Sequence, residues 1–235
     1  MAMPLRLFAI LFLFFTGSTA SHADALYISQ QQVDLAKLLA PPPQAQSDRQ
    51  KQDLMDVLDA QRRRTPEQSE HALADDDLSV FRIAGEVLGS KFSAERLPKT
   101  GAFFNHLMGD VRTIFLATKD VWNRPRPFAV SADVKAIGER PRSGSYPSGH
   151  GIRGYLTAII MANILPEKSA ELFARGRDYG MSRVIAGVHF PSDIEAGRLA
   201  ATALAVGLMQ SPAFTKDLME VKAELRDELG LTTQQ

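Results

Sequence analysis

Apolar residues recur every three or four positions along most of the chain, and this spacing constrains the fold more than any other feature of the sequence. Phe104, Met108, Val111 and Phe115 follow it, and the stretch from Phe214 to Leu229 repeats it. Such spacing places an apolar stripe along one face of a helix, whereas strands need a two-residue alternation that the sequence lacks. We therefore predict an all-α fold, a compact single-domain helical bundle.

Several helix starts are marked by a polar cap followed by proline. The stretch TPEQ from Thr65 to Gln68 combines a cap, a first-turn proline and an acceptor at the third helical position, and Ser211 precedes another proline. In the N-terminal segment, the apolar spacing within residues 54–58 predicts a helix that packs either on the body of the protein or on a partner subunit.

One long segment, from Asn123 to Pro147, departs from the helical pattern. It holds four of the 13 prolines, together with two glycines and four arginines. Long connections without secondary structure are uncommon in compact domains and are usually functional. We predict a long Pro/Gly-rich active-site loop here.

The N-terminus has the composition of a secretory signal peptide. A single basic residue precedes nine apolar residues from Leu7 to Phe15, and Ser21 and Ala23 are the small residues of a cleavage site. The apolar run is too short to span a membrane, which takes about 20 residues. We predict a signal peptide at residues 1–23 and a single all-α domain at residues 24–235. The mature protein is then expected to be periplasmic or secreted, without a membrane anchor.

The composition excludes several classes of function. The chain carries 27 Lys+Arg and 27 Asp+Glu, so it lacks the surplus of basic residues that is typical of nucleic-acid-binding proteins. It contains no cysteine, which excludes disulfide scaffolds, thiolate zinc sites and cysteine nucleophiles.

The string PSGH at residues 147–150 is the first of three polar clusters. Ser148 is a good N-cap, and Gly149 allows the backbone to come close to a ligand. The free N–H groups and the helix dipole at such a start bind anions, and phosphate is a common ligand there. The alternative is an ordinary helix start that binds nothing, with His150 packed or exposed.

His189 and Asp193 belong to the second cluster. Pro191 suits the first position of a helix, which would place Asp193 in the first turn and His189 just before it. A carboxylate at this separation can hold one imidazole nitrogen and leave the other free as a nucleophile. The alternative is a packed histidine beside an ordinary helix-start acid.

The remaining cluster holds Lys119 and Arg126, and Arg183 lies in the cluster of His189, so three cations accompany the two histidines. Each of them alone is compatible with a solvated helix face. Together with two histidines and an aspartate they describe a site for a dianion, and their charges disfavour a His/His/Asp metal site. Tyr146 stands where a G-x-S-x-G motif needs its first glycine, which disfavours a serine nucleophile.

In chain order, Lys-x6-Arg-Pro, Pro-Ser-Gly-His and Ser-Arg-x3-Gly-x-His-x3-Asp resemble the three-part signature of the type-2 phosphatidic acid phosphatase superfamily. Within that superfamily, the string GSYPSGH at residues 144–150 is similar to that of the class A bacterial non-specific acid phosphatases. The motifs run from Lys119 to Asp193, and every signature position is filled. Gly151 departs from the small hydroxyl residue or alanine that class A members usually carry there.

The resemblance implies a role for each of these residues. His189 would attack phosphorus and form a phosphohistidine, and Asp193 would orient His189. Protonated His150 would donate its proton to the leaving group and later activate water. The residues that would bind the phosphate oxygens are Lys119, Arg126, Ser148, Gly149 and Arg183.

The resemblance also implies how such a protein would behave. Residues 24–235 would form one acid phosphatase domain that hydrolyses small phosphomonoesters over a broad substrate range, with some phosphotransferase activity and with inhibition by vanadate. Fixed cations would replace a metal ion, so no metal or other cofactor is expected. No nucleic-acid partner is expected, and the habit of the family favours a homo-oligomer.

Three other functions stay open. A vanadium-dependent haloperoxidase shares the same anion pocket, with vanadate bound at the position equivalent to His189, but such enzymes are usually much longer. A catalytically silent phosphate-binding protein would release its ligand without cleaving an ester. A phosphatase restricted to lipid phosphates would use the same chemistry on a different substrate.

Overall fold

Residues 26–231 are described by a computed structural model, and their regular structure is entirely helical, so the all-α prediction is confirmed. The predicted signal peptide, residues 1–23, lies outside the described residues. The helices in chain order are α1 (Leu35–Leu38), α2 (Asp48–Arg63), α3 (Pro66–Ala74), α4 (Val80–Leu88), α5 (Pro98–Trp122), α6 (Pro127–Val130), α7 (Gly149–Ile164), the 3-10 helix η1 (Pro166–Lys168), α8 (Ser169–Ile185), α9 (Pro191–Leu208) and α10 (Pro212–Glu228). Within the described part of the chain, none of these helices has the length and apolar character needed to cross a membrane.

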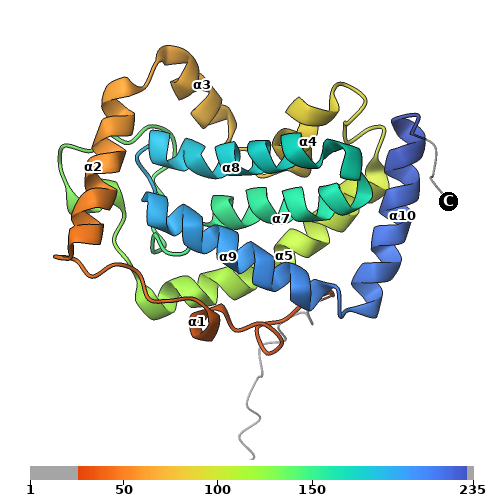
Figure 1. Cartoon of the computed structure of the whole chain (residues 1–235), viewed down its shortest axis with the longest axis horizontal. Helices are drawn as coiled ribbons and strands as arrows, with labels where there is room; N and C mark the ends of the chain where they lie inside the picture. The colour runs from red at the N-terminus through yellow and green to blue at the C-terminus, as the bar shows by residue number, and fades with distance from the viewer. Residues whose placement is uncertain (1–25, 232–235) are drawn as a thin grey trace, which may run out of the picture.

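Helix α7 lies at the centre of the bundle, between α8 and α9 (Figure 1). The long helix α5 crosses this layer, α10 closes one end of the molecule, and α2 and α3 lie at the other end. The core between these helices is apolar and includes the buried side chains of Phe104, Leu107, Leu156, Ile160 and Leu204. The helical stripes predicted from the sequence therefore face a common core.

Two glycines explain how closely α7 packs on α8. A Cβ atom at Gly154 would lie 2.4 Å from the carbonyl oxygen of Gly176, and a Cβ atom at Gly176 would lie 2.5 Å from that of Gly154. Only glycine allows two backbones to approach this closely. Because α7 and α8 run antiparallel, the start of α7 lies beside the end of α8 and the start of α9 (Figure 1).

The helix starts predicted from polar caps are confirmed. Thr65 and Gln68 form a capping box at the start of α3, and the Ser211 side chain caps α10. Ser148 caps α7, with its hydroxyl accepting the N–H of Gly151. A side-chain cap of this kind stabilises a helix by about 1 kcal/mol.

The helix predicted within the N-terminal segment is α2, and it packs on the body of the protein. Its Val57 is fully buried in a small cluster with Val184, Phe190 and Ile194. Of the two alternatives for this helix, packing on the body is therefore confirmed, and it brings the polar side chains of α2 to the start of α9.

The segment from Asn123 to Pro147 is less irregular than predicted. Asn123 ends α5 with a φ of 38°, in the left-handed conformation that often terminates helices. Residues Pro127–Val130 then form the short helix α6. The prediction of a structureless loop was wrong for these four residues, because proline at the first helical position favours a helix start.

Candidate active site

His189 and Asp193 meet at the junction between α8 and α9. His189 lies in the turn before α9, and its Nδ1 is 3.2 Å from Oδ2 of Asp193 in the first turn of that helix. The same oxygen accepts the backbone N–H of Phe190 at 2.8 Å. The helix start therefore holds the carboxylate in place, and the contact expected from the spacing of the two residues is present.

The carboxylate of Asp193 is buried among hydrogen-bond donors. Ser145 Oγ donates to Oδ2, and Arg124 Nη1 donates to Oδ1 at 2.6 Å. Burial alone raises the pKa of Asp193, but His189 and Arg124 outweigh it and hold this pKa well below its usual value. Asp193 is therefore a fixed negative charge next to Nδ1 of the His189 ring.

Arg124 connects the site to the N-terminal part of the chain. Its Nη2 donates to Asp53 Oδ2 at 2.8 Å and to Gln50 Oε1 at 2.6 Å, both on α2. Its Nη1 also donates to Ser192 Oγ at 2.8 Å. These residues were missed in the sequence, although Arg124 lies only two positions before Arg126. Asp53 carries no local signal, because its contact joins segments that are far apart in the chain.

Two of the predicted cations lie on the other side of the His189 ring. Arg126 Nη1 is 3.1 Å from His189 Nε2 and also donates to the carbonyl of Val188 at 2.9 Å. Lys119 Nζ donates to the carbonyl of Gly144 at 2.7 Å. Both cations are buried and are held by carbonyl oxygens rather than by carboxylates, so their charges remain available to an anion.

Burial changes the acidity of this group of side chains. It lowers the pKa of Lys119 to about 7, with the charge of Arg126 acting in the same direction, and lowers the pKa of Arg126 to about 10. Burial and the nearby Arg126 also lower the pKa of His189 to about 3, so its ring is neutral near pH 7. Without an anion, the site disfavours positive charge, and a bound dianion would reverse that effect.

The start of α7 contributes Ser148, Gly149 and His150. Ser148 is fully buried, and its N–H donates to the carbonyl of Asp193 at 3.0 Å. A Cβ atom at Gly149 would lie 3.1 Å from the ring of Phe115, so a glycine suits the close approach of α5 here. The α7 N-terminus and the α9 start are therefore tied together beside His189.

His150 faces the segment that connects α3 and α4. Its Nε2 is 3.1 Å from the carbonyl oxygen of Asp75, and its ring stacks on Tyr179 with centroids 5.2 Å apart. Burial lowers the pKa of His150 well below 6.5, and the charges of Arg183 and His189 act in the same direction. The rings of His189 and His150 are therefore both neutral near pH 7, whereas a histidine that acts as general acid must be in its doubly protonated, positively charged form.

Arg183 is engaged differently from the other predicted cations. Its guanidinium donates to the carboxylate of Asp76 and to the carbonyl of Ala72, and its Nε donates to Ser182 Oγ at 3.1 Å. Its own carbonyl accepts the N–H of His189 at 3.2 Å. The residue thus lies beside His189, but its charge is paired with the α3–α4 segment, which the sequence did not indicate.

The glycine at position 151, where the sequence departs from the family pattern, lies at a tight helix crossing. A Cβ atom at Gly151 would be 3.2 Å from the carbonyl oxygen of Ile194 and 3.4 Å from the Cβ atom of Ser148. Glycine therefore allows α9, which carries Asp193, to lie close against the start of α7.

One group of side chains has a composition compatible with a metal site. Potential ligand atoms of His71, Asp75 and Glu86 lie within 4.8 Å of one another. Both carboxylates are already paired, since Asp75 lies 2.6 Å from Arg175 and 2.8 Å from Arg82, and Glu86 lies 3.0 Å from each arginine. The arrangement is an ion-pair network that braces the α3–α4 segment against α8.

Comparison with known proteins places these motifs in a family. The sequence pattern of the PAP2 superfamily matches residues 102–216. The non-specific acid phosphatase of Providencia stuartii is 30% identical over 210 residues, which cover 86% of this chain and 85% of that protein. The non-specific acid phosphatase of Salmonella typhimurium is 35% identical over 173 residues, covering 70% of this chain and 69% of that protein.

Two further comparisons agree. An acid phosphatase of Zymomonas mobilis is 30% identical over 195 residues, covering 80% of this chain and 74% of that protein. Among solved structures, a transmembrane PAP2 type phosphatidylglycerolphosphate phosphatase from Bacillus subtilis aligns with a TM-score of 0.50 and 20% identity, over 77% of this chain and 91% of that one. The last comparison supports the fold alone.

Proposed function

This chain belongs to the PAP2 superfamily and is a phosphate monoester hydrolase, and from that premise we propose that it is an acid phosphatase acting through a phosphohistidine on His189. The observation that carries the proposal is the position of the His189 ring between Asp193 and Arg126. Nδ1 lies against the Asp193 carboxylate, and Nε2 lies 3.1 Å from a guanidinium nitrogen that can only donate. These contacts assign the ring proton to Nδ1 and leave a lone pair on Nε2.

The first chemical step forms a bond between His189 Nε2 and phosphorus and breaks the ester P–O bond. His150 donates a proton to the departing alkoxide, and Asp193 stabilises the positive charge on the His189 ring. In the second step, His150 takes a proton from water, whose oxygen attacks phosphorus and releases phosphate and His189. An alcohol in place of water would give phosphotransfer.

Binding of the substrate brings negative charge to this group of buried cations and histidines. Lys119, Arg126 and the free N–H groups at the α7 start would contact the phosphate oxygens, and Arg183 would join them on exchanging Asp76 for phosphate. A dianion beside His150 raises the pKa of that ring, because an opposite charge favours the protonated form. The general acid is thus generated in the complex rather than in the free enzyme.

The proposal extends to the predicted leader and to the location of the protein. The basic, apolar and small-residue regions of residues 1–23 support export, so we propose that residues 24–235 act as a single domain in the periplasm or outside the cell. Small phosphomonoesters are the proposed substrates, and no nucleic-acid partner is proposed for a chain with balanced charge.

Hydrolysis of p-nitrophenyl phosphate by residues 24–235 in EDTA tests this function. We expect turnover without added metal, inhibition by orthovanadate, and an excess of nitrophenol over inorganic phosphate when glycerol is added as an acceptor. The excess would report a covalent phosphoenzyme that partitions between water and alcohol. Lack of turnover with any simple ester, or turnover that depends on a divalent metal ion, would reject the proposal.

The pKa of Lys119 predicts a pH dependence. Its pKa is lowered to about 7 in the free enzyme, so the amine is charged below pH 7 and loses its charge as the pH rises above that value. Because kcat/KM reports ionisations of the free enzyme, we expect its decline to steepen above pH 7, where loss of the Lys119 charge adds about a tenfold decrease for each pH unit. A profile measured between roughly pH 5 and 9 checks this expectation, and a constant kcat/KM up to pH 9 would contradict it.

A further inference from the structure

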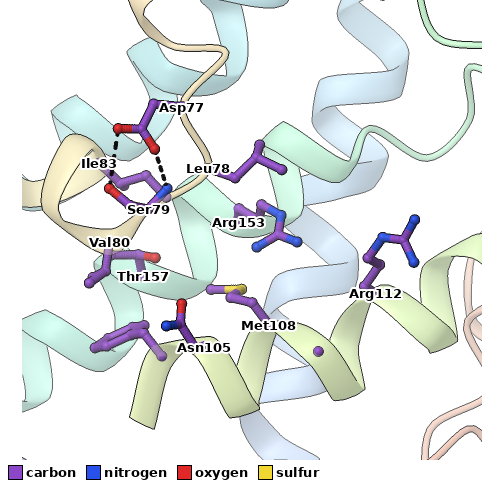
Figure 2. Close-up of a pocket in the computed structure, with 12 residues that line it drawn as sticks. Asp77, Leu78, Ser79, Val80, Ile83, Asn105, Met108, Arg112, Arg153 and Thr157 are labelled. Atoms are coloured by element: carbon purple, nitrogen blue, oxygen red, sulfur yellow. Dashed lines mark hydrogen bonds between the residues drawn. The ribbon is translucent and has the colours of Figure 1, made fainter. Parts of the chain in front are cut away.

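A cavity of about 370 Å³ lies between α5, α7 and the segment that leads into α4 (Figure 2). From α5 it is lined by Asn105, Met108 and Arg112, and from α7 by Arg153 and Thr157. We call it the Arg153 pocket. None of these residues takes part in the phosphatase chemistry described above, so the pocket needs its own explanation.

Arg153 is the most unusual residue of the pocket. Its side chain is buried, with an exposed fraction of 8%, and no hydrogen bond or ion pair joins its guanidinium to any residue in the described range 26–231. Burial lowers its pKa, and the nearby charge of Arg112 acts in the same direction. The residue is largely buried, yet it lines the cavity and has no anionic partner there, so it is placed to bind a ligand of opposite charge.

Other polar groups of the pocket are also free to bind a ligand. Thr157 Oγ1 is buried and has no hydrogen-bond partner among the described residues. Arg112 rises from α5 on the same side as the Arg153 guanidinium, and it is exposed (Figure 2). The one carboxylate of the pocket, Asp77, instead accepts the N–H of Ser79 at 2.8 Å, at the start of α4.

The Arg153 pocket and the phosphate site share structural elements. Arg153 follows His150 by three residues on α7 and Thr157 follows it by seven, which corresponds to about 4.5 and 10.5 Å along a helix axis. The α3–α4 segment contributes a common wall, because Asp75 contacts His150 and Asp77 lines the pocket. A leaving group departing past His150 therefore has the pocket beside it.

We propose that the Arg153 pocket binds a second anionic group, a phosphate or a carboxylate, on the leaving group of the substrate. The inference rests on the proposed phosphatase function and defines a substrate class for it: phosphomonoesters that carry a second anionic group on the leaving group. Arg153 would form two parallel hydrogen bonds to that anion, and Arg112 would add its charge from the rim.

A series of three esters tests the proposal: 3-hydroxypropyl phosphate, propane-1,3-diol bisphosphate and 3-carboxypropyl phosphate. Release of inorganic phosphate gives kcat/KM for each. Because charge-assisted hydrogen bonds are among the strong ones, we expect about tenfold or more preference over the hydroxyl compound for one or both of the substrates whose leaving group carries an anion. Preference for the bisphosphate alone would identify phosphate as the second anion, and preference for both would include carboxylates.

Variants connect the preference to the pocket. In Arg153→Met, the kcat/KM of the bisphosphate divided by that of 3-hydroxypropyl phosphate should fall to about two, the statistical value for two equivalent esters. Arg112 is exposed, so Arg112→Gln does not disturb the buried part of the fold, and in this variant the same ratio should fall severalfold. Arg177→Met, at an exposed arginine of α8, is the matched control and should keep the ratio.

The two levels of the proposal fail in different ways. Hydrolysis of all three esters at similar rates by the unmodified protein would overturn the second-anion site and leave the phosphatase function intact. If the protein hydrolysed neither these three esters nor p-nitrophenyl phosphate, the phosphatase function itself would be overturned. A preference that survives in both Arg153→Met and Arg112→Gln would also overturn the assignment to this pocket.

Discussion

Replacing His189 with alanine is expected to lower kcat for p-nitrophenyl phosphate by about 10⁴-fold or more, because the variant has no group that can carry the phosphoryl group. The imidazole that Asp193 orients would be gone, while Lys119 and Arg126 would remain to bind phosphate. Binding of inorganic phosphate should therefore persist, and the loss should appear in kcat rather than in KM. Steady-state kinetics and phosphate titration of the same preparation measure the two effects.

The matched control is His106→Ala, at an exposed histidine of α5, which should keep full activity. Rapid quenching of the unmodified enzyme with alkali should trap labelled phosphate on His189, since phosphohistidine is stable in base and labile in acid. Trapping of the label on another residue, or activity of His189→Ala within tenfold of the unmodified enzyme, would show that the nucleophile is assigned to the wrong residue.

Much of the proposed site could be found from the sequence because its parts are local. A helix start has short-range signals, and Ser148 acts as the cap that its position predicts. The spacing of His189 and Asp193 likewise encodes a contact within one turn. In such cases, neighbours along the chain determine where a side chain lies, and a short string of residues is sufficient.

The parts that the sequence did not reveal depend on contacts between distant segments. Asp53 reaches Arg124 only because α2 packs against the start of α9, and nothing in the local pattern around Asp53 predicts that packing. The pairing of Arg183 with Asp76 depends in the same way on the path of the α3–α4 segment. Arg153 is a related case, since a sequence cannot show that an arginine is buried without a partner.

The network around Asp193 leads to the second large effect, which is expected for Asp193→Asn. The carboxylate accepts hydrogen bonds from Ser145 and Phe190 N–H on Oδ2, where it also contacts His189, and from Arg124 on Oδ1. An asparagine has only one acceptor oxygen, so in either orientation its NH₂ group faces a donor. It also removes the charge that stabilises the positively charged ring formed when His189 Nε2 bonds to phosphorus.

We expect kcat of Asp193→Asn to fall by about 10³–10⁴-fold, the size of effect known for a histidine that loses its orienting carboxylate. The free energy of unfolding of the variant should also be lower by about 3–5 kcal/mol, because Arg124 loses one of its two buried carboxylate partners and keeps only Asp53. Kinetics and denaturant unfolding of the same sample separate the two losses. Asp120→Asn, at an exposed aspartate of α5, is the control for both.

A loss of stability without a loss of kcat in the folded fraction would mean that Asp193 only braces the junction of α8 and α9. The complementary variant Asp53→Asn distinguishes these roles further, because it weakens the same Arg124 anchor without touching His189. If Asp193 acts on the His189 ring, Asp53→Asn should lower stability by a similar amount and kcat by far less. Equal losses of kcat in the two variants would instead assign the catalytic effect to the position of α9, with the charge of Asp193 contributing little.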